Sequence, residues 1–123
     1  MTRSLMLAAA GFLGAAGILA AAGSAHAGAS QMLISAALVC LAHAPALLAL
    51  ALGNWRSWLL TLAAGLLAVG TLVFAADMGV REFAGGRILP QAAPIGGTLM
   101  IGGWLCVIAG GIASLWQSRT GLP

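Results

Sequence analysis

Four apolar runs of about 20 residues each dominate this sequence, at about residues 5–25, 32–52, 58–77 and 94–116. At a rise of about 1.5 Å per residue, a helix of this length matches the ~30 Å hydrocarbon core of a bilayer. Lipid offers no hydrogen-bond partners to the backbone, so apolar runs of this kind must form helices. The sequence therefore predicts an all-α membrane protein in which residues 1–123 form one domain, a small antiparallel bundle of four transmembrane helices.

The composition excludes an ordinary water-soluble domain. Hydrophobic residues make up 62% of the chain and charged residues 6%, whereas a soluble domain is about 25% charged. The five basic residues are arginines placed near the ends of the apolar runs, with no clustered patch, so nucleic acid is not an expected partner. The two cysteines, Cys40 and Cys106, lie inside apolar runs without metal-ligand spacing and are predicted to be reduced, buried thiols.

The first apolar run imitates a secretory signal peptide. Arg3 precedes it, and Ala25-His26-Ala27 follows it like a cleavage site. The run is longer than the apolar core of about 7–15 residues that such signals carry. We therefore expect it to be a retained first span.

The arginines also predict the topology. Four spans place both termini on one side of the membrane, together with Arg3, Arg56 and Arg119, and leave Arg81 and Arg87 on the other side. Because positive residues accumulate in cytoplasmic segments, the count favours cytoplasmic termini.

The last run carries three glycines at a spacing of seven, Gly96, Gly103 and Gly110, which places them on one helix face. Small residues let two helices approach closely in a membrane. We expect the fourth helix to lie at the centre of the bundle with this face as its contact surface. Gly14 and Gly17 offer a matching small surface, so the first helix is the expected neighbour.

His43 lies about halfway along the second span, where ionisable groups are rare and often mark a pathway or a ligand site. The alternative is a neutral histidine that bonds to Thr71 or to a carbonyl freed by Pro45, where a kink is expected. A haem shared by His26 and His43 is not expected, because His26 lies at the membrane edge, about 18 Å away along the helix axis. No cofactor or metal is therefore predicted.

Asp77 ends the third apolar run, and Arg81 follows at the i,i+4 spacing that favours an ion pair. One interpretation is a local salt bridge that closes the helix. The other is an ionic cluster with His26, Glu82 and Arg87 that receives a partner protein or an ion. The sequence holds no set of nucleophile, base and acid, so we do not expect an enzyme.

Residues 93–104, which read APIGGTLMIGGW, resemble the C-terminal motif of the YgdD-like family of small four-span membrane proteins, a family of unknown function with bacterial members and animal relatives. Elements at residues 22–26, 43–48 and 70–77 are similar to further motifs of that family. The third of these elements departs from the family pattern, because Ala75 and Ala76 stand at the positions of its serine and glycine, and Asp77 at the position of its second serine. The resemblance implies a four-span fold in a bacterial inner membrane, but no reaction.

Two functional hypotheses remain at this level. The first is a structural or accessory protein of the lipid bilayer that packs against other integral membrane proteins or against itself. The second is a small transporter or ion-conducting oligomer that uses His43 and Asp77. The two differ in whether these side chains line a common hydrated cavity.

Overall fold

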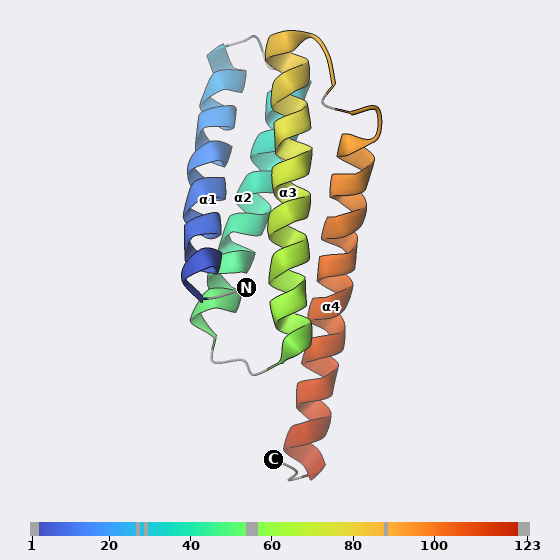
Figure 1. The fold of residues 1–123 in the computed structure, drawn as a ribbon. Helices are drawn as coiled ribbons and strands as arrows, with labels where there is room; N and C mark the ends of the chain where they lie inside the picture. The colour runs from blue at the N-terminus through green and yellow to red at the C-terminus, as the bar shows by residue number, and fades with distance from the viewer. Residues whose placement is uncertain (1–2, 27, 29, 54–56, 88, 121–123) are drawn as a thin grey trace.

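The computed structural model describes residues 3–26, 28, 30–53, 57–87 and 89–120, and only the backbone for residues 117–120. Four antiparallel helices make up the described fold (Figure 1): α1 (Arg3–His26), α2 (Gln31–Leu52), α3 (Trp58–Ala84) and α4 (Ala92–Thr120). Each is long and apolar enough to cross a membrane, and no strand occurs among the described residues. The prediction of a four-span helical membrane protein is confirmed. Arg56 and the side chain of Arg119, on which the predicted topology depends, lie outside the described residues.

Local sequence explains where these helices begin and end. The hydroxyl of Ser30 caps α2 by accepting a hydrogen bond of 3.4 Å from the backbone N–H of Leu33. Pro94 falls in the first turn of α4, where a missing N–H costs nothing. Within α2, Pro45 interrupts the hydrogen-bond ladder, yet the helix continues through it to Leu52.

The third helix is longer than the sequence predicted. We expected it to end at Asp77, but it continues for about two more turns, to Ala84. The charge of Asp77 does not stop the helix, because the carboxylate pairs with Arg81 on the next turn of the same helix. The stop is instead Gly85, whose φ of 64° is the left-handed conformation that ends many helices.

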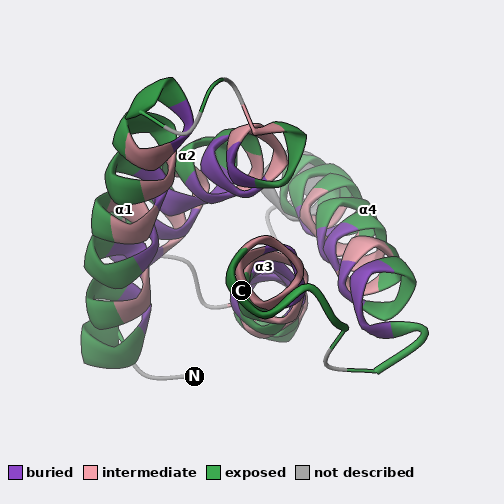
Figure 2. Cartoon of the chain, turned by 90° about the horizontal axis from the view of Figure 1, so that it is seen from above, coloured by how far each residue is buried: buried purple, intermediate pink, exposed green. Residues whose placement is uncertain are grey.

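The centre of the bundle is α3, not α4. Viewed along the bundle axis, α1, α2 and α4 form an arc, and α3 lies within it (Figure 2). Helix α3 packs against each of the other three, whereas the backbone of the described part of α4 comes close only to that of α3. The expected central place of the fourth helix and its expected contact with the first are therefore wrong. Because α4 has a single glycine face, only one helix can approach its backbone closely, and that helix is α3.

The main core is formed mostly by the first three helices, and α4 adds Met100 to it. Its most buried large side chains are Leu13 on α1, Leu47 on α2 and Leu67 on α3. Cys40 is buried in the same cluster, while Cys106 on α4 is only half-buried, and both are free thiols. Since α3 supplies residues to this core and also carries α4, it connects the two parts of the bundle.

The glycine face of α4 meets α3 along its whole length. At Gly96 the two backbones touch: a Cβ atom built there would lie 2.7 Å from the carbonyl oxygen of Gly70. Further along, a Cβ atom at Gly103 or at Gly110 would lie 2.8 Å from a leucine side chain of α3. The seven-residue spacing thus follows the α3–α4 contact, in which the backbones lie closest at Gly96 and leucine side chains are the nearest partners of Gly103 and Gly110.

Gly14 and Gly17 lie on the α1–α2 contact instead of facing α4. A Cβ atom at Gly17 would lie 2.8 Å from Leu41, and one at Gly14 would lie at an ordinary 3.8 Å from Ala44. Neighbours in sequence pair first here, since a short turn brings α1 and α2 together before any distant helix can compete.

Candidate functional site

The imidazole of His43 makes two hydrogen bonds in the middle of the bundle. Its Nδ1 lies 2.7 Å from the carbonyl oxygen of Val39, and its Nε2 lies 3.2 Å from the indole nitrogen of Trp104. A carbonyl only accepts and an indole N–H only donates, so the contacts require a neutral ring with the proton on Nδ1. The ring centroids of His43 and Trp104 are 6.0 Å apart and tilted by 54°. His43 is buried, whereas Trp104 is 43% exposed.

This arrangement corrects the expected partners of His43. The carbonyl that it binds belongs to Val39, one turn earlier, and not to the residue whose amide partner Pro45 removes. Thr71 instead donates to the sulfur of Met100 at 3.4 Å, inside the α3–α4 contact.

Trp104 is the residue that sequence reasoning missed. It is 61 positions from His43 in the chain, and the sequence marked it only as part of a family motif. One signal was available, because an indole N–H inside a membrane needs an acceptor, and His43 lies at a similar depth of its own span.

At the end of the bundle that holds the α1–α2 and α3–α4 connections, Asp77 and Arg81 form an ion pair on successive turns of α3. The carboxylate is fully buried, and the arginine side chain is 20% exposed. The pair that the spacing predicts is therefore formed, but within the helix and not at its end. A buried charge of this kind depends on its partner, because lipid and protein interior offer little solvation.

A second polar contact links α2 to α3 at the same end. The hydroxyl of Ser30 donates to Oε2 of Glu82 at 2.5 Å, and the hydroxyl of Ser24 lies 3.4 Å from the carbonyl oxygen of Ser30. One serine thus caps α2, binds the last turns of α3 and receives a contact from α1. These bonds fix three helix ends relative to one another.

Two members of the expected ionic cluster lie apart from these contacts. His26 is exposed, and its Nδ1 bonds to the carbonyl of Ala22 in its own helix at 2.8 Å. Arg87 is exposed in the connection after α3. Of the expected ionic cluster, Asp77 is thus paired with Arg81, and Glu82 with the hydroxyl of Ser30.

Ser30→Ala is expected to destabilise the bundle by about 1–2 kcal/mol, because it removes the helix cap and leaves the Glu82 carboxylate without its hydroxyl donor. Ser35→Ala is the matched control, since the Ser35 hydroxyl bonds only to the carbonyl of Gln31 in the same helix. Thermal unfolding of both variants in detergent measures the difference. Equal melting temperatures would show that the Ser30–Glu82 contact contributes nothing.

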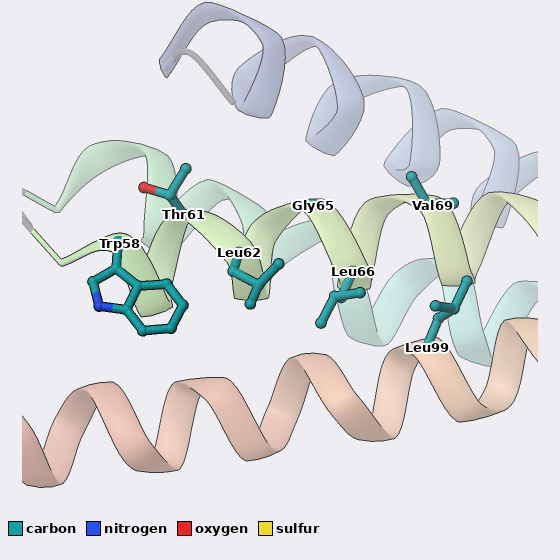
Figure 3. A pocket seen from close by; sticks show the side chains of 7 residues that line it. All are labelled: Trp58, Thr61, Leu62, Gly65, Leu66, Val69 and Leu99. Atoms are coloured by element: carbon teal, nitrogen blue, oxygen red, sulfur yellow. The ribbon is translucent and has the colours of Figure 1, made fainter.

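Apolar side chains line three hollows on the surface of the bundle. One of them, of about 600 Å³, lies along α3, with Trp58, Leu62 and Leu66 on one side and Leu99 of α4 on the other (Figure 3). A second hollow, of about 300 Å³, lies between α1, α2 and α3, and a third, of about 240 Å³, between α2 and α4. Neither His43 nor Asp77 lines any of the three.

Metal ligands do not gather in the part of the chain that the structure describes. No group of three or more His, Cys, Asp and Glu side chains lies close enough there to hold an ion. His43 and His26 each bond to a carbonyl of their own helix, and the second bond of His43 goes to an indole.

Comparison with known proteins identifies the family. The family model described as "Protein of unknown function (DUF423)" matches residues 13–97, which include His43 and the Asp77–Arg81 pair and end before Trp104. No curated protein and no solved structure matches the chain significantly. Because the family model covers more than half of the 123 residues, this four-span membrane protein belongs to the DUF423 family of proteins of unknown function.

Proposed function

We propose that the protein is a non-catalytic structural or accessory component of a bacterial inner membrane, which acts by packing its helices against another integral membrane protein or a second copy of itself. The proposal puts both termini in the cytoplasm, because three arginines lie on the side of the termini and two on the other side. The family membership is consistent with this proposal but carries no activity.

The observation that carries the proposal is how the polar groups within the spans are used. His43 bonds to Trp104, Thr71 to Met100, and Asp77 to Arg81, all within the chain. The first two bonds join α4 to α2 and to α3, and the third neutralises a buried charge within α3. A protein of this kind acts by offering an apolar surface on which another membrane protein can pack.

The outer face of α4 is the surface that we assign to the partner. The backbone of the described part of α4 approaches only that of α3, and Trp104 adds a side-chain bond to α2. Large apolar side chains stand exposed along the rest of the helix: Ile95, Ile101, Leu105, Ile108, Ile112 and Leu115. Association between helices in lipid depends on packing, and a helix fixed on one side only keeps most of its surface for that purpose.

Transport is the second candidate, and the full burial of the Asp77 carboxylate is the observation in its favour. Intramembrane acids often belong to ion pathways. Against it, Asp77 is paired with Arg81, His43 is bonded to α4, and the three apolar hollows include neither residue. The accessory role therefore accounts for more of the observations.

Purification of the full chain in mild detergent, followed by native mass spectrometry, tests the proposal. We expect a stoichiometric membrane partner or a homo-oligomer. Ala109→Trp, on the exposed face of α4, should dissociate that complex, whereas Ala21→Trp, on the exposed face of α1, should leave it intact. A purely monomeric protein, or equal effects of the two substitutions, would contradict the assignment.

A further inference from the structure

Helix α4 is joined to α2 by side chains alone. Among the described residues the backbone of α4 comes near only to that of α3. The hydrogen bond of 3.2 Å between Trp104 and His43 spans the remaining gap. Trp104 also lines the hollow of about 240 Å³ between α2, α3 and α4. The other residues that line it are Ala46, Ala49, Leu50, Leu67 and Val107.

We propose that His43 and Trp104 form a proton-sensitive latch that holds α4 against α2. The latch requires the neutral ring: Nδ1–H donates to Val39, and the lone pair of Nε2 accepts the indole N–H. When His43 takes up a proton at Nε2, both ring nitrogens become donors, and the Nε2–H then faces the N–H of Trp104. The bond that ties α4 to α2 is lost, while the Nδ1 bond to Val39 remains.

Among the described residues, none places an opposite charge beside His43 that would keep the protonated ring in place. The titratable and charged side chains described on the four helices are Arg3 and His26 on α1, Cys40 on α2, Asp77, Arg81 and Glu82 on α3, and Cys106 on α4. Cys40 is one turn from His43 on the same helix, and the two acids lie toward the far end of α3. No described ion pair includes His43. Protonation therefore opens the contact and does not replace it with a salt bridge.

The fold provides a pivot for this motion. Gly96 and Gly70 fix α4 to α3 by backbone contact, and Trp104 lies eight residues further along α4, about 12 Å away. Beyond Gly96 the nearest partners of the glycine face are leucine side chains of α3. The nearest backbone atom there is the carbonyl oxygen of Ala63, which a Cβ atom at Gly103 would approach to 3.2 Å, a looser contact than the one at Gly96. Loss of the latch therefore lets the C-terminal part of α4 swing away from α2, which opens the hollow between them to lipid. The latch acts within one chain and does not depend on the proposed partner.

Spin-label distances in lipid nanodiscs test this proposal on the full chain. Labels are attached to Leu52→Cys, at the end of α2, and Ser114→Cys, near the end of α4, with Cys40→Ala and Cys106→Ala to remove the native thiols. We expect one distance at neutral pH and a longer one after acidification to a pH at which the His43 ring is protonated. Trp104→Phe keeps the aromatic ring but removes the donor, and should give the longer distance at both pH values. A short distance in Trp104→Phe, or a pH-dependent shift that persists in it, would overturn the latch.

A second measurement needs no variant of the latch itself. In a His26→Gln protein His43 is the only histidine, and its imidazole ¹⁵N resonances report the tautomer directly. We expect a proton on Nδ1 at neutral pH, and a shift of the Trp104 indole N–H resonance in step with protonation of the ring. A proton on Nε2 at neutral pH, or an indole resonance that ignores the titration, would refute the proposed bond.

Discussion

Gly96→Ala is expected to lower the free energy of unfolding by about 1–3 kcal/mol, the usual cost of overpacking a tight contact. The added methyl group would lie 2.7 Å from the carbonyl oxygen of Gly70 and 2.9 Å from the backbone nitrogen of Phe74. Neither atom can move without displacing α3, so the two helices must separate. Chemical or thermal unfolding in detergent measures the loss.

Gly97→Ala is the matched control, because nothing lies within 4 Å of a Cβ atom at Gly97. This neighbouring substitution should stabilise the helix by up to about 1 kcal/mol, since alanine is the better helix former. Gly103→Ala should fall between the two variants, because the closest clash there, at 2.8 Å, is with the side chain of Leu67, and the nearest backbone atom, the carbonyl oxygen of Ala63, lies at 3.2 Å. If Gly96→Ala proved as stable as Gly97→Ala, the backbone contact between α3 and α4 would be ruled out.

Arg81→Met is expected to cost about 3–5 kcal/mol, the largest effect that we predict for a polar residue. Methionine keeps much of the length of the side chain but leaves the fully buried Asp77 carboxylate without its cation. The cost arises mainly from the unpaired buried charge, and less from the lost attraction. Unfolding in detergent at neutral pH is the measurement.

Combining Arg81→Met with Asp77→Leu should restore most of that loss, because the double variant removes both charges and leaves an apolar contact. Arg87→Met serves as the control for a change of positive charge, since Arg87 is exposed in the connection after α3, and its effect should stay within about 0.5 kcal/mol. A double variant as unstable as Arg81→Met would mean that the pair has a role beyond neutralising a buried acid.

Much of the fold follows from local properties of the sequence. Length and hydropathy place the four spans, because the bilayer fixes how many apolar residues a helix needs. The hydroxyl of Ser30, which accepts a bond from Leu33, and the left-handed conformation of Gly85 set helix ends within a few residues of the chain. The ion pair of Asp77 and Arg81 follows from i,i+4 geometry alone. The predicted end of α3 was wrong because it treated a charge as a stop, although a paired charge can remain inside a helix.

Which helices become neighbours does not follow from local properties of the sequence. The glycine spacing of α4 predicts that some helix approaches its glycine face, but every other span here is also rich in small residues. Packing energies in lipid are short-ranged and depend on how two surfaces fit, which a one-dimensional pattern does not contain. That fit makes α3 the partner of α4 and the centre of the bundle, and leaves Gly14 and Gly17 to α2.

The sequence by itself thus determined the membrane class, the number of spans and their approximate boundaries. It also identified the polar residues inside the spans. Each of these depends on the solvent and on near neighbours in the chain. Only the tertiary structure decided that Trp104, 61 positions away, is the partner of His43, and that Glu82 binds the cap of α2. Hydrogen bonds act over about 3 Å, so such partners are chosen only after the helices have packed.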